Sequence, residues 1–472
     1  MPPTMVFEKQ NTRKSEHPRN NFNTVRTVTF SNISKTATHY WQFAVVLMKF
    51  IEVILIIVTV FADTCRSDDN LNHCSRNNDH LRNLLITKAQ MDFTLKLLRH
   101  SSKANETSLL SPFAVVSAMS VLYSGARGKT EREIGAAISA GQTKRTFENY
   151  MECTIKNIRD QLKDRNFTTH YSTKIYDQGN FLRPDFKDIA SQQYAYDSAQ
   201  IDFASFLKAN GSKFNQWANR NKSVGVGSTI HVMSHYPVYL FNKLEFDAYW
   251  EYEFPSLNYT SPFRFTTSRK IDIPMMVRTA EFPYYEDQQI QMVSLPLRNS
   301  EMEMLIILPK KIFGLGKFEA KLTGRKLFSY VEELIVSGNV TVRMPKFTSR
   351  NKRYLTSALK KMGMRSMFER TADFSGISNQ KSPTFIDVLN VAHIKINEKG
   401  INNENSSIPV NNVVTIGDGE QFVADHPFLY VIINNRETIL WMGRFAPTEK
   451  DLIVGNLAKV VENKEVPRKR EK

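Results

Sequence analysis

The sequence predicts an α+β fold, in which helices and strands are segregated along the chain. Helix-type spacing of apolar residues dominates the first half, and strand-type runs and alternation dominate the second half. No regular succession of strand and helix is present, which argues against a doubly wound parallel sheet. With 472 residues, 41% of them hydrophobic, the chain is long enough to bury a large core.

An apolar segment in the first quarter predicts export. Residues 48–62 have a basic start and an apolar run interrupted only by Glu52, and they end at Ala62, as a secretory signal cleaved after Ala62 would. The uncharged run alone is too short to span a bilayer, so a signal anchor is the less favoured alternative. We therefore expect a secreted protein with no membrane association after signal cleavage.

The remaining boundaries follow from composition. Residues 1–47 are polar and basic without periodicity, and we hypothesise that Met48 is the true start. Residues 63–85 form a linker, residues 86–448 one folded domain, and residues 449–472 a basic, solvated tail. The net charge of +16 is spread along the chain rather than collected in one aromatic-rich block, so no nucleic-acid partner is expected.

Three cysteines rule out a disulfide framework. In an oxidising compartment Cys65 and Cys74 could close a small loop and leave Cys153 unpaired. The alternative of a metal site at Cys65, His73, Cys74 and His80 is disfavoured, because the spacing matches no structural zinc pattern. We expect neither a metal nor a cofactor.

Asparagine acceptor motifs for glycosylation support export. Asn339 stands at the start of a predicted strand, which leaves its use open, whereas the others fall in polar surroundings. The favoured acceptors are Asn105, Asn166, Asn210, Asn221, Asn258 and Asn405.

Helices are predicted first along the chain. Apolar residues recur at helical spacing over residues 87–99, and Ser111 with Pro112 supplies an N-cap and first-turn proline for a buried helix over residues 113–123. Thr130 and Glu133 form a capping box for the next helix. Later helices are expected at residues 184–194, around residues 214–217, and over residues 354–362 before Gly363.

Strands follow, with a first group at residues 174–181 and 199–203 and a second group that dominates from residue 236 onward. Apolar runs, alternation and flanking turn residues predict these second-half strands. They are expected at residues 238–246, 292–295, 304–308, 340–344, 394–396, 428–433 and 439–442.

A long segment without core periodicity separates the strand at residues 394–396 from that at residues 428–433. Connections this long inside a compact domain are usually functional or disordered. Val413, Val414, Thr415 and Ile416 form a short apolar tetrad between polar residues and a glycine-rich end. We call residues 413–416 the bait, since an exposed apolar tetrad is a surface that a partner can bind.

A series of short motifs runs through the predicted domain: LSPF at 110–113, LYSGARG at 122–128, FNQW at 214–217, Asn242 with Trp250, PMM at 274–276, PKF at 345–347, ADFSGI at 372–377, NEKG at 397–400, ADHPF at 424–428 and MGR at 442–444. In these motifs, their order and their spacing, the sequence resembles the serpin family over about residues 89–447.

The resemblance implies a monomeric, single-domain fold of three β-sheets and eight or nine helices, with a reactive loop over residues 400–424. In inhibitory serpins a protease cleaves the bait, and the segment after Gly400 inserts as a new central strand and traps the acylated protease. The serpin supplies no catalytic residue; His393 and His426, for example, have no nucleophile pattern nearby. Counting from Glu398 places the scissile bond after Val414, and counting back from Pro427 places it after Ile416.

The bait contains no Arg or Lys, which disfavours a trypsin-like target and favours an extracellular elastase-like or chymotrypsin-like protease. The hinge, residues 398–407, departs from the inhibitory pattern of small residues. Ile401, Asn403, Asn405 and Ser407 would point inward on insertion. Burying an amide without partners costs about 1 to 3 kcal/mol, and a glycan on Asn405 could not be buried at all.

The region where the sheet must open also departs from the family. Ser111 and Asn242 are retained, but Ala114 replaces a usual serine and Asn390 a usual histidine. Two interpretations therefore remain. The protein engages an extracellular serine protease with doubtful trapping efficiency, or it is a non-inhibitory serpin that acts as a binding, carrier or signalling protein.

Overall fold

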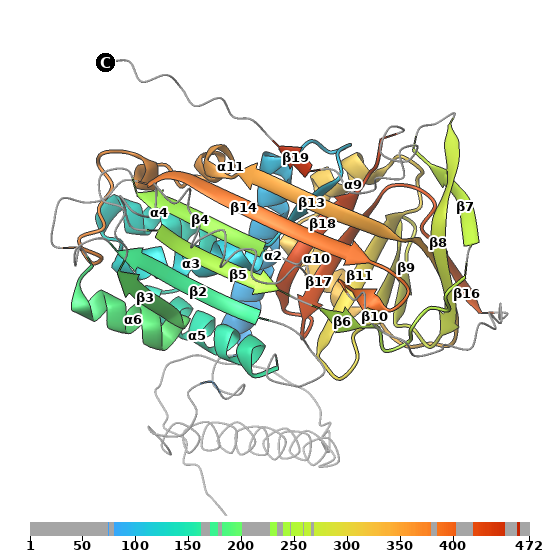
Figure 1. Ribbon diagram of the computed structural model, residues 1–472, viewed down its shortest axis with the longest axis horizontal. Helices are drawn as coiled ribbons and strands as arrows, with labels where there is room; N and C mark the ends of the chain where they lie inside the picture. The colour runs from blue at the N-terminus through green and yellow to red at the C-terminus, as the bar shows by residue number, and fades with distance from the viewer. Residues whose placement is uncertain are drawn as a thin grey trace, which may run out of the picture. The chain divides into compact units, whose positions relative to one another are not determined.

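The structure is a computed structural model that describes residue 74 and residues 80–161, 170–177, 182–200, 227–233, 239–245, 247–257, 259–265, 269–378, 385–402, 419–448 and 460–462. All of them lie in one compact unit, Cys74–Lys472. The described residues form eight α-helices and three β-sheets, which confirms the α+β prediction (Figure 1). The helices are α2 (His80–Ser101), α3 (Pro112–Gly125), α4 (Gly128–Ile138), α5 (Lys144–Gln161), α6 (Pro184–Tyr194), α9 (Leu315–Lys321), α10 (Gly324–Glu332) and α11 (Thr356–Lys361), with a 3-10 turn η1 (Ser366–Phe368).

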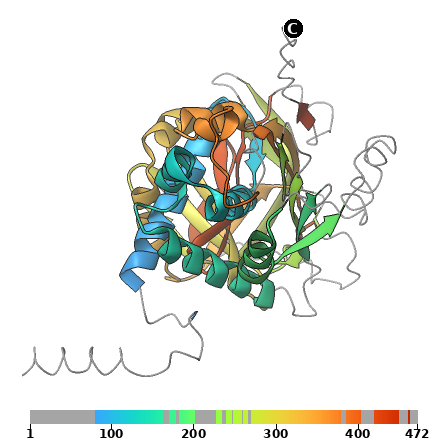
Figure 2. The ribbon, with the colours of Figure 1, turned by 90° about the vertical axis from the view of Figure 1, so that its left-hand side faces the viewer.

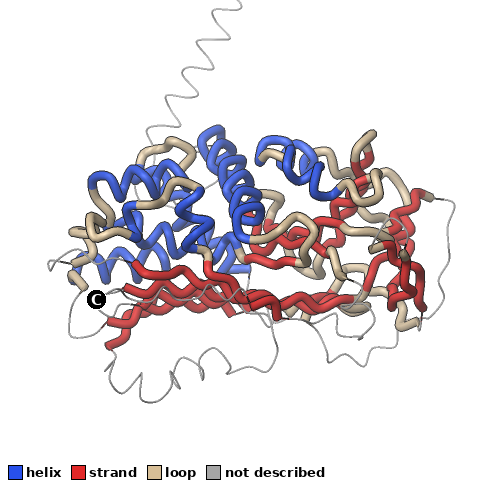
Figure 3. Tube along the Cα trace, turned by 90° about the horizontal axis from the view of Figure 1, so that it is seen from above, coloured by secondary structure: helices blue, strands red, loops and turns tan. Residues whose placement is uncertain are grey.

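The large sheet has nine strands and carries the hinge region. The helices gather on one of its faces, as Figure 3 shows, and Figure 2 views α2 to α6 from the end where they pack together. Its strand order is β19 (Val460–Glu462), β13 (Phe347–Tyr354), β14 (Phe385–Ile396), β4 (Gly227–Met233), β5 (Tyr239–Glu245), β2 (His170–Asp177) and β3 (Tyr196–Gln200), with β15 (Gly400–Ile401) pairing with β14 and with β6 (Ala248–Tyr249).

Two smaller sheets complete the core. In the six-stranded sheet β11 and β17 are buried along their whole length, as strands covered on both faces are. Its order is β1 (Ser108–Leu110), β18 (Thr438–Phe445), β17 (Phe428–Asn434), β11 (Met302–Pro309), β10 (Ile290–Pro296) and β9 (Tyr284–Glu286). The four-stranded sheet has the order β16 (Glu420–Val423), β12 (Val340–Pro345), β8 (Lys270–Ala280) and β7 (Tyr259–Arg264).

Helix α3 forms the centre of the molecule. All 14 of its residues are buried, as its uniformly apolar sequence predicts, and it contacts β18 as well as β4 and β5. Ser111 precedes it but does not cap it through its side chain; its hydroxyl instead donates to the Leu440 carbonyl at 3.0 Å. The expected side-chain cap is therefore wrong, because a longer-range acceptor in β18 takes the hydroxyl proton.

The capping box predicted at Thr130 and Glu133 is also wrong. Helix α4 starts two residues before Thr130, and both side chains hold loops from elsewhere in the chain. Thr130 Oγ1 accepts from the Asp373 amide at 2.9 Å, and Glu133 Oε2 accepts from the Arg365 and Ser366 amides at 2.8 and 2.6 Å. The side chains of Thr130 and Glu133 thus accept hydrogen bonds from distant backbone amides instead of from the first turn of their own helix. The motif marks a contact between α4 and other loops.

The disulfide also differs from the expected one. Cys74 is bonded to Cys153 in α5, with 5.2 Å between their Cα atoms, so the predicted Cys65–Cys74 loop is wrong and Cys153 is not the unpaired cysteine. The short spacing of Cys65 and Cys74 favoured a small loop, whereas the fold brings Cys74 beside a residue 79 positions away. Cys65 and His73, two of the residues weighed for a metal site, lie outside the described residues.

Most predicted elements are found, some with shifted ends. The helix at residues 184–194 matches α6, and Gly363, with φ +103°, follows α11 as the predicted stop. The predicted helix around residues 214–217 lies outside the described residues. In the tail, residues 460–462 pair in parallel with β13, so these three residues extend the large sheet instead of forming part of a solvated extension.

Candidate functional site

The chain leading into the reactive loop is fixed by backbone hydrogen bonds on both sides. Strand β15 sits between β14 and β6, with Ile401 opposite Ile396 and Gly400 opposite Tyr249. Just before it, the amides of Trp250 and Phe254 donate to the carbonyls of Lys399 and Glu398 at 2.9 and 2.8 Å. The hinge therefore begins as an integral part of the large sheet.

The turn from β14 into β15 depends on Asn397 and Gly400. Asn397 Oδ1 accepts from the amides of Lys399 and Gly400 at 3.0 and 3.2 Å, and the Trp250 indole donates to the Asn397 carbonyl at 2.8 Å. A Cβ atom on Gly400 would lie 1.8 Å from the Ala248 carbonyl oxygen. Only glycine permits β6 to approach so closely, which accounts for the predicted hinge glycine.

Glu398, the predicted acidic residue of the hinge, forms an ion pair. Its Oε1 lies 2.8 Å from Lys346 Nζ, in the link between β12 and β13, and both side chains are only partly exposed. The pair ties the start of the hinge to the junction of the large and four-stranded sheets. A partly exposed pair contributes little net stability, so we assign it an orienting role.

Strand β15 ends at Ile401, and the next residue is Asn402, which has no place in the sequence-based prediction. Ile401 is completely buried, and Asn402, next along the chain, is also buried and has φ +56°. The Asn402 amide donates to the Lys395 carbonyl at 2.7 Å, and the Lys395 amide donates to Asn402 Oδ1 at 2.7 Å. The side-chain carbonyl thus accepts a hydrogen bond that a backbone carbonyl accepts in a continuing antiparallel strand. Asparagine is enriched at positive φ, which was the available sequence signal.

The residues predicted to control sheet opening are not all brought together. Asn390 of β14 and Asn242 of β5 share one row of the large sheet, but Thr229 of β4 stands between them in the register. Asn390 is buried, and neither polar atom of its amide has a hydrogen-bond partner among the described residues. Ser111 bonds to Leu440 and Ala114 is buried in α3, so neither links the two asparagines.

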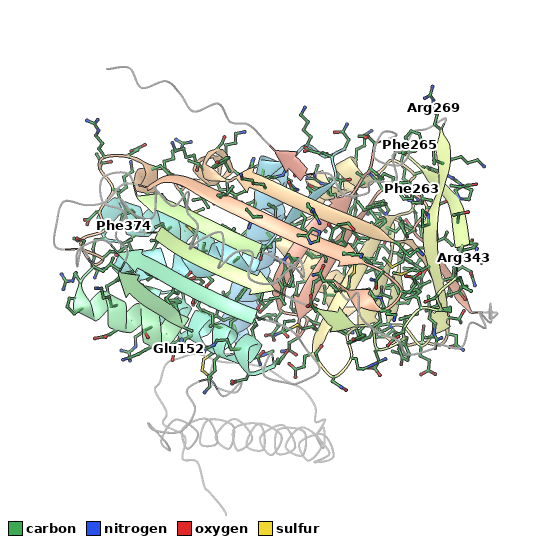
Figure 4. The ribbon with its side chains drawn as sticks, in the orientation of Figure 1. Glu152, Phe263, Phe265, Arg269, Arg343 and Phe374 are labelled. Atoms are coloured by element: carbon green, nitrogen blue, oxygen red, sulfur yellow. A yellow bond between two sulfur atoms is a disulfide. The ribbon has the colours of Figure 1, made fainter. Side chains whose placement is uncertain are left out.

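The far end of the reactive loop is anchored on a different sheet. Strand β16 runs parallel to β12, and shortly after it the Asp425 carbonyl accepts from the Arg264 amide at 2.7 Å. Figure 4 marks Phe263 on β7 and Arg343 on β12 at this end of the molecule, with Phe374 at the opposite end. The two anchors of the loop thus belong to the four-stranded and the large sheet.

His426 is held as a structural residue. Its Nδ1 lies 2.7 Å from Asp425 Oδ1, and its Nε2 lies 2.7 Å from the Pro309 carbonyl oxygen. Burial would raise the pKa of Asp425, but the hydrogen bond from His426 and the charges of His426 and Arg264 outweigh it and hold that pKa below its usual value. With both ring nitrogens engaged, His426 fixes the end of the loop.

Several predicted residues lie outside the described part of the chain. Of the acceptor asparagines, Asn105 is described and exposed, and so is Asn339, directly before β12. Those outside are the bait residues 413–416, the hinge residues Asn403 and Asn405, and the acceptors Asn166, Asn210, Asn221 and Asn258.

Neither a metal centre nor a membrane-spanning helix is found in the described part of the chain. No three His, Cys, Asp or Glu side chains cluster there as metal ligands would. None of the helices described combines the length and the hydropathy that crossing a bilayer requires.

The fold and the doubly anchored loop define a class of protein that comparison with known families identifies. The family model described as serpin (serine protease inhibitor) matches residues 88–447, and the chain belongs to the serpin family. Members of this family are generally protease inhibitors rather than enzymes.

Individual relatives are distant but cover the whole domain. The chain is 26% identical to the leukocyte elastase inhibitor of Xenopus laevis over 377 residues, which are 76% of this chain and 99% of that protein. It is 27% identical to an uncharacterized serpin-like protein of Thermococcus kodakarensis, covering 76% and 85% of the two chains. Among solved structures it is similar to Serpin48 of the insect Tenebrio molitor (TM-score 0.64, 24% identity, 79% and 100% covered) and to uncleaved ovalbumin (TM-score 0.63, 22% identity, 77% and 100% covered).

Proposed function

We propose that the protein is a secreted serpin that presents residues 413–416 as bait to an extracellular serine protease. The observation that carries this proposal is the anchoring of the intervening chain. The last described residue before the bait, Asn402, is hydrogen-bonded to β14 of the large sheet, and the first strand after the bait is β16, paired with β12 of the four-stranded sheet. A segment held by its two ends on separate sheets is suited to display.

The composition of the bait supports an elastase-like or chymotrypsin-like protease. Val413, Val414, Thr415 and Ile416 offer apolar side chains of medium size and no cation for a trypsin-like pocket. Relatives named as leukocyte elastase inhibitors point to the same class of target.

Secretion is supported by two further features. A disulfide such as Cys74–Cys153 persists in oxidising compartments and is rare in reducing ones. The acceptor Asn105 is exposed in a turn, where a glycan could be attached without burial. Both features agree with the signal segment at residues 48–62.

We further propose that cleavage leads mainly to release of a cut serpin and only inefficiently to a trapped protease. At its first step insertion must break the hydrogen bond from the Lys395 amide to Asn402 Oδ1 and replace it with one to a backbone carbonyl, and it must then bury Asn403 and Asn405. A barrier raised by about 1.4 kcal/mol slows insertion roughly tenfold relative to hydrolysis of the acyl-enzyme. The same observation favours the second candidate function, a non-inhibitory serpin that binds, carries or signals.

Incubation of the secreted protein with an elastase-like and a chymotrypsin-like protease tests the proposal. We expect cleavage within residues 403–418, located by mass spectrometry, with only a small fraction of denaturant-stable covalent complex on a gel. The same proteases with their catalytic serine replaced by alanine serve as the control for covalent linkage. Failure of every such protease to cut this segment would refute protease engagement and leave the binding role, whereas complete conversion to covalent complex would refute inefficient trapping.

A further inference from the structure

Strand β4 occupies the centre of the large sheet, between β14 and β5. It is antiparallel to both, from Ser228 opposite Val391 to Met233 opposite Phe385 on one side, and from Gly227 opposite Leu244 to Val232 opposite Tyr239 on the other (Figure 1). Its neighbours β14 and β5 are therefore not paired with each other along this length. The segment reaches this place from the chain immediately before β5, to which it is joined by residues 234–238.

Strand β15 enters the same gap from its other end. Ile401 pairs with Ile396 of β14 on one side and with Ala248 of β6 on the other, and β6 follows β5 directly in the chain. The row of positions between β14 and the β5–β6 segment thus holds β15 at one end and β4 at the other. Among the strands that the structure describes, none pairs with the stretch of β14 between the two on this side.

The register decides how far a strand that grows from β15 can extend. Ile401 lies opposite Ile396, and each further residue moves one position back along β14. Ser406 would come opposite Val391 and Ser407 opposite Asn390, but these positions are held by Ser228 and Thr229. Only residues 402–405 fit before the two segments compete for the same backbone groups.

We propose that β4 is a self-inserted strand that must be expelled before the reactive loop can insert fully. An incoming strand would gain backbone hydrogen bonds to β14 and β5 of the kind that β4 already makes. Replacement of β4 by the loop strand therefore changes the free energy little. The free energy that otherwise drives insertion is reduced to the difference between the pairing energies of the two strands. β4 acts as a built-in competitor that keeps the sheet closed to its own loop.

Amide hydrogen exchange on the full chain tests the occupancy directly and without any protease. We expect the amides of residues 227–233 to be protected like those of β5 and β14. Exchange of these amides at the rate of an unstructured peptide would overturn the proposal, whatever the outcome of the protease assays.

The competition is tested with Ile230→Pro, which removes one N–H donor from β4, and with Ile230→Val as the control that keeps it. This readout uses cleavage of the loop and so rests on the proposed function, whereas the exchange measurement does not. We expect cleavage to change the Tm of the wild type and of Ile230→Val little, and to raise the Tm of Ile230→Pro clearly. An equally large rise in Tm for the wild type would contradict competition by β4. Should Ile230→Pro fail to fold, amide hydrogen exchange is measured on the wild type after loop cleavage. The proposal requires the amides of β4 to remain protected there, and loss of that protection would contradict it.

Discussion

At the scale of single residues, Asn402 interrupts the regular antiparallel pairing that β15 begins. Its φ is positive, and its side chain and its amide satisfy both backbone groups of Lys395. The usual small residues of an inhibitory hinge could not do this, since an alanine has no side-chain acceptor. Asn402 therefore stabilises the hinge before insertion, and this raises the free-energy cost of insertion.

Replacement of Asn402 tests this role. Asn402→Ala leaves the Lys395 amide without its acceptor and strains the left-handed backbone, so we expect the free energy of unfolding to fall by about 2 kcal/mol. Asn402→Gly loses the same hydrogen bond but tolerates positive φ, and we expect about half that loss. Urea unfolding measures both; equal stabilities for the wild type and Asn402→Ala would show that the contact carries no net stabilisation.

The lowered pKa of Glu286 on β9 predicts that the stability of the protein depends on pH. Hydrogen bonds from Lys310 and then from Tyr284 lower its pKa to about 2 from its usual 4.5. Because the folded-state pKa is depressed, the ionised carboxylate stabilises the fold above pH 4.5, and this contribution is lost as the pH falls toward about 2. The carboxyl group also accepts from Gln291, which donates to Gln421 in the distal anchor β16.

We expect Glu286→Gln to be less stable than the wild type near neutral pH and to approach it near pH 2. The side chain is partly exposed, so solvent screening keeps the effect small. Urea unfolding across this pH range gives the difference, with Glu281→Gln, at an exposed carboxylate between β8 and β9, as the control. A difference that does not change with pH would refute the assignment.

At the scale of elements, the disulfide Cys74–Cys153 ties the start of the folded unit to α5. Cys153→Ser should lower the free energy of unfolding by about 2 to 4 kcal/mol under oxidising conditions, because a cross-link over a long loop restricts the unfolded chain. Cys65→Ser is the matched control and should leave the stability unchanged. The reverse result, with only Cys65→Ser destabilising, would restore the Cys65–Cys74 pairing.

Elements whose sequence dictates their burial were predictable. Helix α3 is apolar on every side and α6 has a proline start, and both appear where the periodicity places them. The motif at residues 397–400, which carries part of the family resemblance, forms the turn from β14 into β15, where Asn397 Oδ1 accepts from the amides of Lys399 and Gly400. What could not be predicted depends on distant partners: Thr130 and Glu133 bond to other loops, and Cys74 finds a residue far along the chain.

Strand β4 is one of the elements that were missed, together with the longer α5 and β8. It lies in a short polar and apolar stretch between a glycine and a proline-containing connection, which gives no strong strand signal. Its conformation is determined by the open backbone groups of β14 and β5 on either side. Backbone pairing with neighbouring strands can stabilise a strand in a sequence of low β-propensity, and the local sequence pattern does not predict such a strand.

At the scale of the whole molecule, the family fold is kept while the parts that must move are altered. The six-stranded sheet and α3 form a buried core of ordinary apolar packing. Asn402 follows β15 directly, and Asn390 of β14, which stands where the family usually has histidine, lies opposite Thr229 of β4. On the proposal made above, a fold whose relatives are named as inhibitors is combined with a sheet that resists opening.

The position of β4 between β14 and β5 also affects how copies of the protein can associate. Unpaired N–H and C=O groups along a strand are templates for strands from other chains, and they promote aggregation. Along the length of β4 both neighbouring strands already have their partners. If β4 hinders insertion of the protein's own loop as we propose, the same hydrogen bonds would also deny these backbone groups to a loop from another copy.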